Sequence, residues 1–230
     1  RNEISPRQSL IRLREFTIID LEFFFDPEEP NCHLLKDVEN EELHLVLAED
    51  KLRGSEKITE VTVKKALEKG YIKAEWQAVF MALAKKLLIE LGVPAEKQRF
   101  IEKLPWERAH YSLQSFDQQF YDVRWGWTEL SGHAYRTDYD LKSHGKASGE
   151  DLSVSPLGEG ERVIPHVIEP SFGVERITYC ILEHCYREGD RDWTWFQFPP
   201  KIAPIEVIVI PLMRKDKLPE KAKDIYRTLK

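Results

Sequence analysis

The chain has 230 residues, of which 42% are hydrophobic and 32% charged, and its formal net charge at pH 7 is −6. This apolar content is enough for a core in one large domain or one and a part, and the negative charge argues against non-specific nucleic-acid binding. No run of about 18 apolar residues occurs, so we expect no membrane span and a cytoplasmic protein.

Metal and disulfide chemistry find little support in the sequence. The three cysteines, Cys32, Cys180 and Cys185, form no CxxC pair, and their odd number argues against a disulfide scaffold. The seven histidines show no HExxH and no zinc spacing. We therefore interpret the cysteines as small buried hydrophobic residues.

The N-terminal segment predicts an arginine-rich hairpin. Residues 9–16 (SLIRLREF) alternate apolar and charged side chains, and residues 1–4 suit the end of an earlier strand across a turn at 5–8. Thr17 is placed to cap a following helix, which the prolines at 27 and 30 would end.

Residues 31–109 have a different pattern, which we interpret as an insertion carrying no chemistry of its own. Short apolar runs predict strands over 44–47 and 58–63. Helices are predicted over 63–69 and 73–91, the second with an apolar stripe and a Gly–x–Pro stop.

The second half of the chain returns to strand-like composition. Predicted elements are strands at 110–116, 119–123, 126–130 and 163–168, a polar loop at 131–139, a Gly- and Ser-rich surface loop at 143–162, a helix at 171–185, a strand at 205–210 and a helix from 219. Residues 201–230 carry eight Lys and Arg against four Asp and Glu, whereas the whole chain is acidic, which hints at two modules.

Three segments could carry chemistry. The hairpin arginines Arg1, Arg7, Arg12 and Arg14 can grip phosphates, and Phe16 can stack on a base, although spacing alone favours a solvated hairpin with ordinary ion pairs. IEPSFGVER, residues 168–176, places Glu169, Ser171 and Arg176 at a strand–helix junction, where Ser171 could equally be a simple N-cap. Glu129 lies in a predicted strand among apolar residues and needs a cation or metal partner.

In this order, the segments resemble glycyl-tRNA synthetase, the class II aminoacyl-tRNA synthetase of the dimeric archaeal and eukaryotic type. RNEISPRQSLIRLREFT is similar to its motif 2, VIEPSFGVERI to its motif 3, GWTELSGHAYRTDYDL and HGKASGEDL to segments between, and FPPKIAPIEVIVIPL to the passage into the anticodon-binding domain. The resemblance covers nearly all of 1–30 and 110–230.

The resemblance implies an α+β fold: an antiparallel sheet with flanking helices, then the start of an α/β anticodon-binding domain. Residues 1–200 would form the catalytic core, incomplete at its N-terminus and carrying the insertion at 31–109, and residues 201–230 would begin the anticodon-binding domain. It also implies ATP-dependent activation of glycine, transfer to tRNA(Gly), a requirement for Mg²⁺, and a homodimer in the whole protein. These 230 residues alone are expected to be inactive because motif 1 is absent.

Site residues follow from the same resemblance. The catalytic set would be Arg1, Glu3 and Arg176; the ATP contacts Arg1, Asn2, Glu3, Arg12, Leu13, Phe16, Glu129, Leu130 and Arg176; the glycine contacts Asp20, Glu169, Pro170 and Ser171; and the magnesium ligand Glu129. Asp20 stands where the family has glutamate, and Glu175 where motif 3 has its third glycine. An acid there would repel a triphosphate unless it points away.

Two other functions remain open from the sequence. One is a class II ligase for another small amino acid, and the other is a synthetase-like nucleotide- or RNA-binding protein without catalysis. The first is disfavoured by Glu169-Pro170-Ser171 beside so many acids, which suit a small pocket around an ammonium group.

Overall fold

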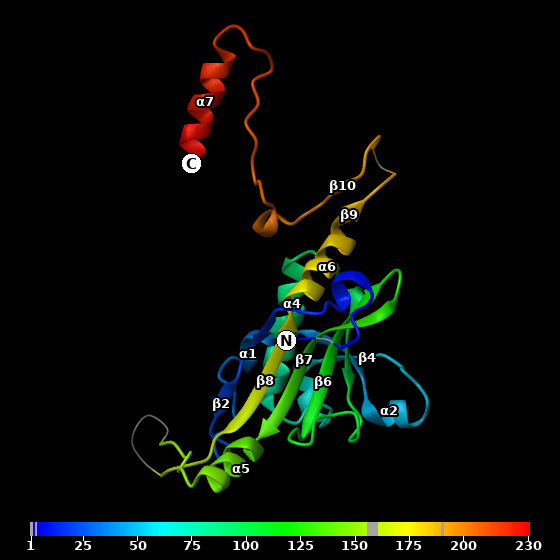
Figure 1. Ribbon diagram of the computed structural model, residues 1–230, viewed down its shortest axis with the longest axis vertical. Coiled ribbons are helices and arrows are strands. Elements are labelled where there is room, and N and C mark those ends of the chain that lie inside the picture. Colours follow the sequence, from blue (N-terminus) through cyan, green and yellow to red (C-terminus); the bar gives the residue numbers. More distant parts are fainter. Residues whose placement is uncertain (1, 3, 156–160, 190) are drawn as a thin grey trace.

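The computed structural model describes every residue except 1, 3, 156–160 and 190. Its centre is an eight-stranded sheet in the order β1-β8-β7-β6-β5-β3-β4, with β2 also paired to β8 (Figure 1). All neighbours are antiparallel except β3 and β5. The strands are β1 Ile18–Asp20, β2 Phe23–Phe25, β3 Glu42–Val46, β4 Thr59–Thr62, β5 Gln98–Glu102, β6 Gln114–Asp122, β7 Gly126–Thr137 and β8 His166–Gly173.

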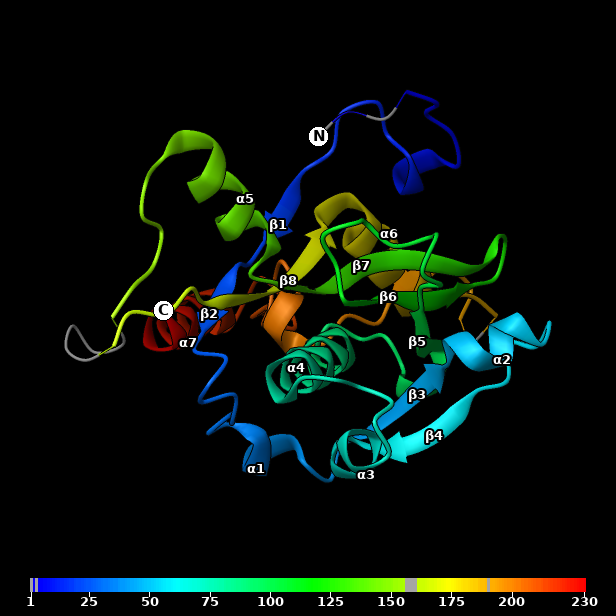
Figure 2. The same cartoon turned by 90° about the horizontal axis from the view of Figure 1, so that it is seen from below.

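A long helix lies along one face of this sheet, as Figure 2 shows. The helices are α1 Leu35–Val38, α2 Ala48–Leu52, α3 Val63–Glu68, α4 Glu75–Glu90, α5 Tyr139–Ser148, α6 Val174–Cys185 and α7 Leu218–Leu229, and a small hairpin pairs β9 Tyr186–Arg187 with β10 Trp195–Phe196. This mostly antiparallel sheet with flanking helices matches the α+β fold expected from the sequence.

The main core lies between the sheet and α4. Phe100, Phe116 and Ile168 of the sheet are buried in one cluster with Ala78 and Met81 of α4. The expected apolar stripe is only partly right, because Leu83 and Leu87 are about two-fifths exposed while the alanines face the sheet. Small side chains on that face allow the helix to approach the strands closely.

Residues 31–109 are built into the sheet and its covering layer. They supply β3, β4, β5 and α4, and most of the buried residues of the main core. Their end also reaches the cleft described below, through Lys103 and Ala109. Residues 31–109 are therefore part of the folded core. That they are an insertion relative to other proteins of the family stays a prediction.

Five local expectations were wrong. Residues 9–16 form no strand, because Ser9–Ile11 turns as a 3-10 helix that buries Ile11 in an apolar cluster. The helix after Thr17 is replaced by β1 and β2, because Phe23 and Phe25 pack on Trp76 and Tyr135 while their backbones pair with β8. The loop at 131–139 is mostly β7, and part of the loop at 143–162 is α5; residues 156–160 of that loop lie outside the described residues.

The fifth concerns residues 205–210, which form no strand. Ile205, Val207, Ile208 and Ile210 are each at least 65% exposed, since no described strand lies beside them to accept their backbone hydrogen bonds. The helix that follows, α7, is present as expected, and Figure 1 shows it at the end of an extended segment.

Candidate functional site

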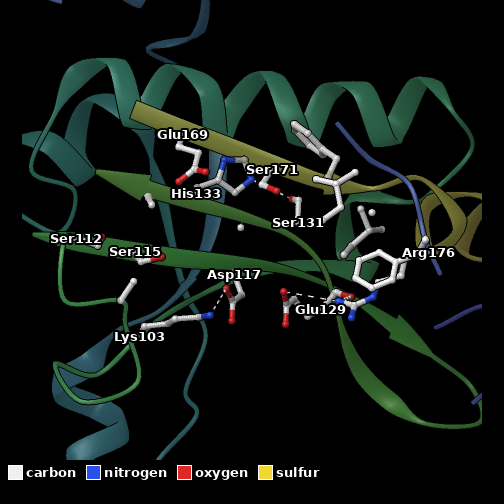
Figure 3. A pocket seen from close by; sticks show the side chains of 18 of the residues that line it. Lys103, Ser112, Ser115, Asp117, Glu129, Ser131, His133, Glu169, Ser171 and Arg176 are labelled. Atoms are coloured by element: carbon white, nitrogen blue, oxygen red, sulfur yellow. Dashed lines mark hydrogen bonds and ion pairs between the residues drawn. The ribbon is translucent and has the colours of Figure 1, made fainter. Parts of the chain in front are cut away.

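A cleft of about 260 Å³ opens over β6, β7 and β8, on the face of the sheet opposite α4. Directly paired residues of antiparallel strands share a face, so the register defines the floor of the cleft. One row runs Asp20, Ser171, Gly132, Asp117 across β1, β8, β7 and β6. The adjacent same-face row runs through Glu169 with the small residues Ala134 and Ser115 (Figure 3).

Alternate residues of the same strands face the core. Ser131 and His133 are buried there, and the Ser131 hydroxyl donates to the side chain of Gln118 at 2.9 Å and lies 3.0 Å from Nε2 of His133. Burial lowers the pKa of His133 to about 3, so the ring is neutral. This polar network explains why β7 looks like a loop in sequence.

Arg176 ties three segments together at one end of the cleft. It lies in the first turn of α6, and its Nε donates to the carbonyl of Ile11 in the hairpin at 2.9 Å. Its Nη1 lies 3.6 Å from the carboxylate of Glu129 on β7. Phe16 lines the same cleft. Glu129 is exposed, with 48% of its side chain open to solvent. The expectation that this carboxylate is buried and needs a cation to offset the cost was therefore wrong.

The other end of the cleft is acidic and tightly paired. Glu169 lies 2.9 Å from Arg136, whose guanidinium also bonds Asp140 and stacks on Tyr111. Burial raises the pKa of Glu169 above its usual value, and Arg136 opposes that shift. The Ser171 hydroxyl donates to Asp20, so the two glycine contacts expected from distant parts of the chain are in contact.

Asp117 and Lys103 form a second ion pair on the cleft floor, 3.0 Å apart. Burial and the nearby charge of Glu129 raise the pKa of Asp117 to about 6 despite the lysine. Two carboxylates that repel each other beside a polar cleft fit a divalent cation, since carboxylate oxygens are preferred Mg²⁺ ligands.

Glu175 points away from the cleft. Both of its carboxylate oxygens accept from the backbone N–H of Thr17, at 3.0 and 2.9 Å, where β1 begins. The residue does not line the cleft. The acid that replaces a motif 3 glycine therefore joins the start of α6 to the start of β1.

The cleft gathers six of the expected site residues: Phe16, Glu129, Leu130, Glu169, Ser171 and Arg176. Asp20 contacts it through Ser171, whereas Pro170 is buried and its carbonyl accepts from Leu21 N–H at 3.0 Å. Asn2, Arg12 and Leu13 lie in the hairpin, where Asn2 bridges to Glu15, and do not line the cleft. Arg1 and Glu3 lie outside the described residues.

The sequence did not single out Lys103, Tyr111, Ser115, Asp117 or Gly132, which also line the cleft. A signal for Asp117 does exist: Phe116, Gln118 and Phe120 alternate with it and are buried, so Asp117 belongs to the opposite, polar face. Its charge alone is indistinguishable from that of an ordinary surface residue.

Together these groups suit a substrate with a polyanionic end and an ammonium end. Arg176 can hold phosphate oxygens with a charged, planar donor set. The carboxylates at the far end can accept from an ammonium group. Among the described residues no group of three or more His, Cys, Asp and Glu forms a ready metal site, and none of their helices is long and apolar enough to cross a membrane.

Curated sequences resemble the chain over its whole length. The glycine–tRNA ligase of Methanocaldococcus jannaschii is 35% identical over 313 residues, which cover all of this chain and 54% of that protein. The chain is homologous to the glycine–tRNA ligases. The ligases of Aeropyrum pernix (35% identical) and Pyrococcus horikoshii (34%) match it equally fully, over 52% and 53% of their own lengths.

The chain spans about half the length of the glycine–tRNA ligases it matches. A solved structure of Giardia lamblia prolyl-tRNA synthetase in complex with prolyl-adenylate superposes on 98% of this chain and 34% of that one, with a TM-score of 0.53 and 15% identity. The fold is thus that of a class II aminoacyl-tRNA synthetase. No protein-family model matches the chain.

Proposed function

We propose that the protein containing this chain is a glycine–tRNA ligase, which joins glycine to ATP as glycyl-adenylate and transfers glycine to tRNA(Gly). The similarity to the archaeal ligases over the full chain supports this activity. The observation that carries it is that two separate segments meet in one cleft. Glu129 comes from one of them, and Glu169, Ser171 and Arg176 come from the other.

In the first step the carboxylate of glycine attacks the α-phosphorus of ATP, a phosphorus–oxygen bond forms, and pyrophosphate leaves. Arg176 would neutralise charge on the departing phosphates, and Phe16 would stack on adenine. Arg1 and Glu3 carry the corresponding motif 2 roles in this proposal. The residues need only hold and orient the reactants, so no nucleophilic side chain is required.

Glycine offers only an ammonium and a carboxylate to recognise. Glu169, Asp20 and Ser171 would hold the ammonium, with Arg136 fixing the position of Glu169 at 2.9 Å. In the second step a ribose hydroxyl at the 3′ end of the tRNA attacks the glycyl carbonyl and AMP leaves.

Glu129 and Asp117 would hold Mg²⁺. Bound there, the ion would neutralise phosphate charge and orient the triphosphate. The proposal also includes a homodimer and a cytoplasmic location, with light scattering and cell fractionation as their tests.

ATP–pyrophosphate exchange on the full-length protein tests this function. We expect exchange with glycine, and much less with alanine or serine. Arg176→Lys, which keeps the charge but loses the fork of donors, should lower kcat/KM by roughly 100-fold. Arg162→Lys, on an exposed pair with Asp151, is the matched control and should leave exchange unchanged.

Two results would contradict the proposal. Greater exchange with alanine or serine than with glycine would assign a different class II ligase. Binding of ATP without exchange with any of the three amino acids would favour a binding protein without catalysis.

A further inference from the structure

Gly132 occupies the centre of the cleft floor. It lies in β7 between Ser171 on β8 and Asp117 on β6, and Ser171 in turn pairs with Asp20 on β1. Its two direct neighbours in the row, Ser171 and Asp117, line the cleft with a hydroxyl and a carboxylate. Gly132 alone presents no side chain.

The backbone does not require glycine here. The φ of Gly132 lies outside the left-handed region that favours glycine. A glycine inside a strand also weakens it, because the residue loses more conformational freedom on folding and has no side chain to pack. Local folding therefore favours a larger residue at this position.

Packing does not require glycine either. A Cβ built on Gly132 meets a single atom within 4 Å, Oδ1 of Asp117, at 4.0 Å, which is ordinary contact. The contrast with Gly92 is sharp, because a Cβ there would lie 2.8 Å from Sγ of Cys185. A methyl group at 132 would thus fit the protein and project into the cleft.

We propose that Gly132 shapes the amino-acid subsite: its missing side chain leaves the space that the backbone of the substrate occupies among Ser171, Asp20 and Glu169. The inference rests on the proposed function and deepens it. Ala134, the next β7 residue on this face, is also small. The β7 strand therefore adds little side-chain volume to the cleft between the polar residues of β6 and β8. A methyl group added at 132 competes directly with the substrate for that space.

The test is Gly132→Ala in the full-length protein, measured by ATP–pyrophosphate exchange and by thermal unfolding. We expect kcat/KM for glycine to fall roughly 10- to 200-fold, the range for one methylene in a pocket. The KM for ATP should stay within about threefold of wild type, because the added Cβ lies within 4 Å of neither Arg176 nor Phe16 and meets Asp117 only at an ordinary contact distance of 4.0 Å. The Tm should be unchanged or higher.

Gly54→Ala is the control, with the opposite expected effects on stability and on substrate use. Gly54 has a φ of +76° and nothing within 4 Å of an added Cβ, so its variant should lower Tm through strain and leave both KM values unchanged. A glycyl-sulfamoyl adenosine analogue provides a second readout. It should raise the Tm of wild type and of Gly54→Ala, and do so far less for Gly132→Ala.

The outcomes separate the two proposals. Normal kcat/KM for glycine in Gly132→Ala, with an active wild type, would overturn the role of Gly132 and leave the ligase function standing. A fall in Tm with a parallel loss of ATP and glycine use would mean a structural role and also overturn it. A wild type that exchanges with none of the amino acids would overturn the ligase function itself.

Discussion

Arg136 is the cation on which the acidic end of the cleft depends. Its guanidinium lies 2.9 Å from Glu169 and bonds Asp140 at 2.8 and 2.6 Å, and it is 4.4 Å from the centre of the Tyr111 ring. Arg136→Met keeps much of the side-chain volume and removes the charge. The substitution leaves Glu169 in a half-buried site without its partner.

The expected cost follows from the burial of the pair. Removing one partner of a buried ion pair costs about 3–5 kcal/mol, and an exposed pair is worth about 0–1 kcal/mol. Only 17% of the Arg136 side chain and 16% of the Glu169 side chain are exposed. We therefore expect a loss near the lower end of the buried range, about 3 kcal/mol, which lowers Tm by roughly 6–12 °C in a chain of this size.

Urea unfolding followed by circular dichroism measures the loss. It should depend on pH, because the pKa of Glu169 is already raised by burial and loss of Arg136 raises it further. A carboxyl whose pKa is raised by folding stabilises the fold below its unfolded pKa and loses that contribution as pH rises through the folded pKa. The deficit of Arg136→Met should thus be smaller near pH 5 than near pH 7.5.

Arg53→Met is the matched control, since Arg53, the residue that follows α2, forms an exposed pair with Glu49 at 3.9 Å. Its cost should be about 0.3–0.5 kcal/mol at most. If Arg136→Met cost no more than this control, or if its deficit grew on acidification, the account of Arg136 as the charge partner of Glu169 would be wrong.

Two further predictions concern carboxylates outside the cleft floor. Burial, and then a hydrogen bond with Asp122, raise the pKa of Glu183 to about 7, so wild-type stability should fall between about pH 4.5 and 7. Glu183→Gln should remove about 1–2 kcal/mol of that fall in urea titrations, and an unchanged slope would contradict the raised pKa. Glu175→Ala removes the acceptor for Thr17 N–H and should cost about 0.5–1 kcal/mol while the KM for ATP stays constant, whereas a large change in that KM would place the carboxylate in the cleft.

The sequence predicts the elements whose periodicity is local. The helix around Trp76 follows from apolar spacing and is present. The expected order of a strand followed by a helix is also present, but β8 continues to Gly173 and α6 begins at Val174, so Ser171 lies in the strand and caps no helix. The contact between Asp20 and Ser171, 151 residues apart, was expected only through resemblance to a family. Nothing local in either segment specifies that pairing.

The failures have physical causes in tertiary context. Phe23 and Phe25 form a strand because β8 supplies backbone partners and Trp76 and Tyr135 supply packing, neither of which a local pattern contains. Ser131 and His133 looked like loop residues because their burial depends on a side-chain network with a neighbouring strand. Gly132 looked like one more loop glycine for the same reason.

The N-terminal hairpin gives little support to the prediction that its arginines bind phosphates. Two isolated antiparallel bridges, Asn2 to Glu15 and Arg7 to Arg12, join its two arms, but the strand expected over 9–16 does not form. Among the described residues of that segment, Phe16 alone lines the cleft, and the sequence does not fix where the other side chains point. Phosphate contacts by Arg12 remain a prediction.

The three ion pairs around the cleft, Arg176–Glu129, Lys103–Asp117 and Arg136–Glu169, have one common consequence. In each pair, the proposed ligand-binding side chain already contacts a partner with the same sign of charge as the ligand. Arg176 contacts a carboxylate where phosphate would bind. Asp117 and Glu169 contact a cation where a metal ion or an ammonium group would bind. Ligand entry then becomes an exchange of partners rather than the capture of bare charge. Substitutions that neutralise both members of a pair should consequently disturb the resting protein less than either single change, yet impair its chemistry more.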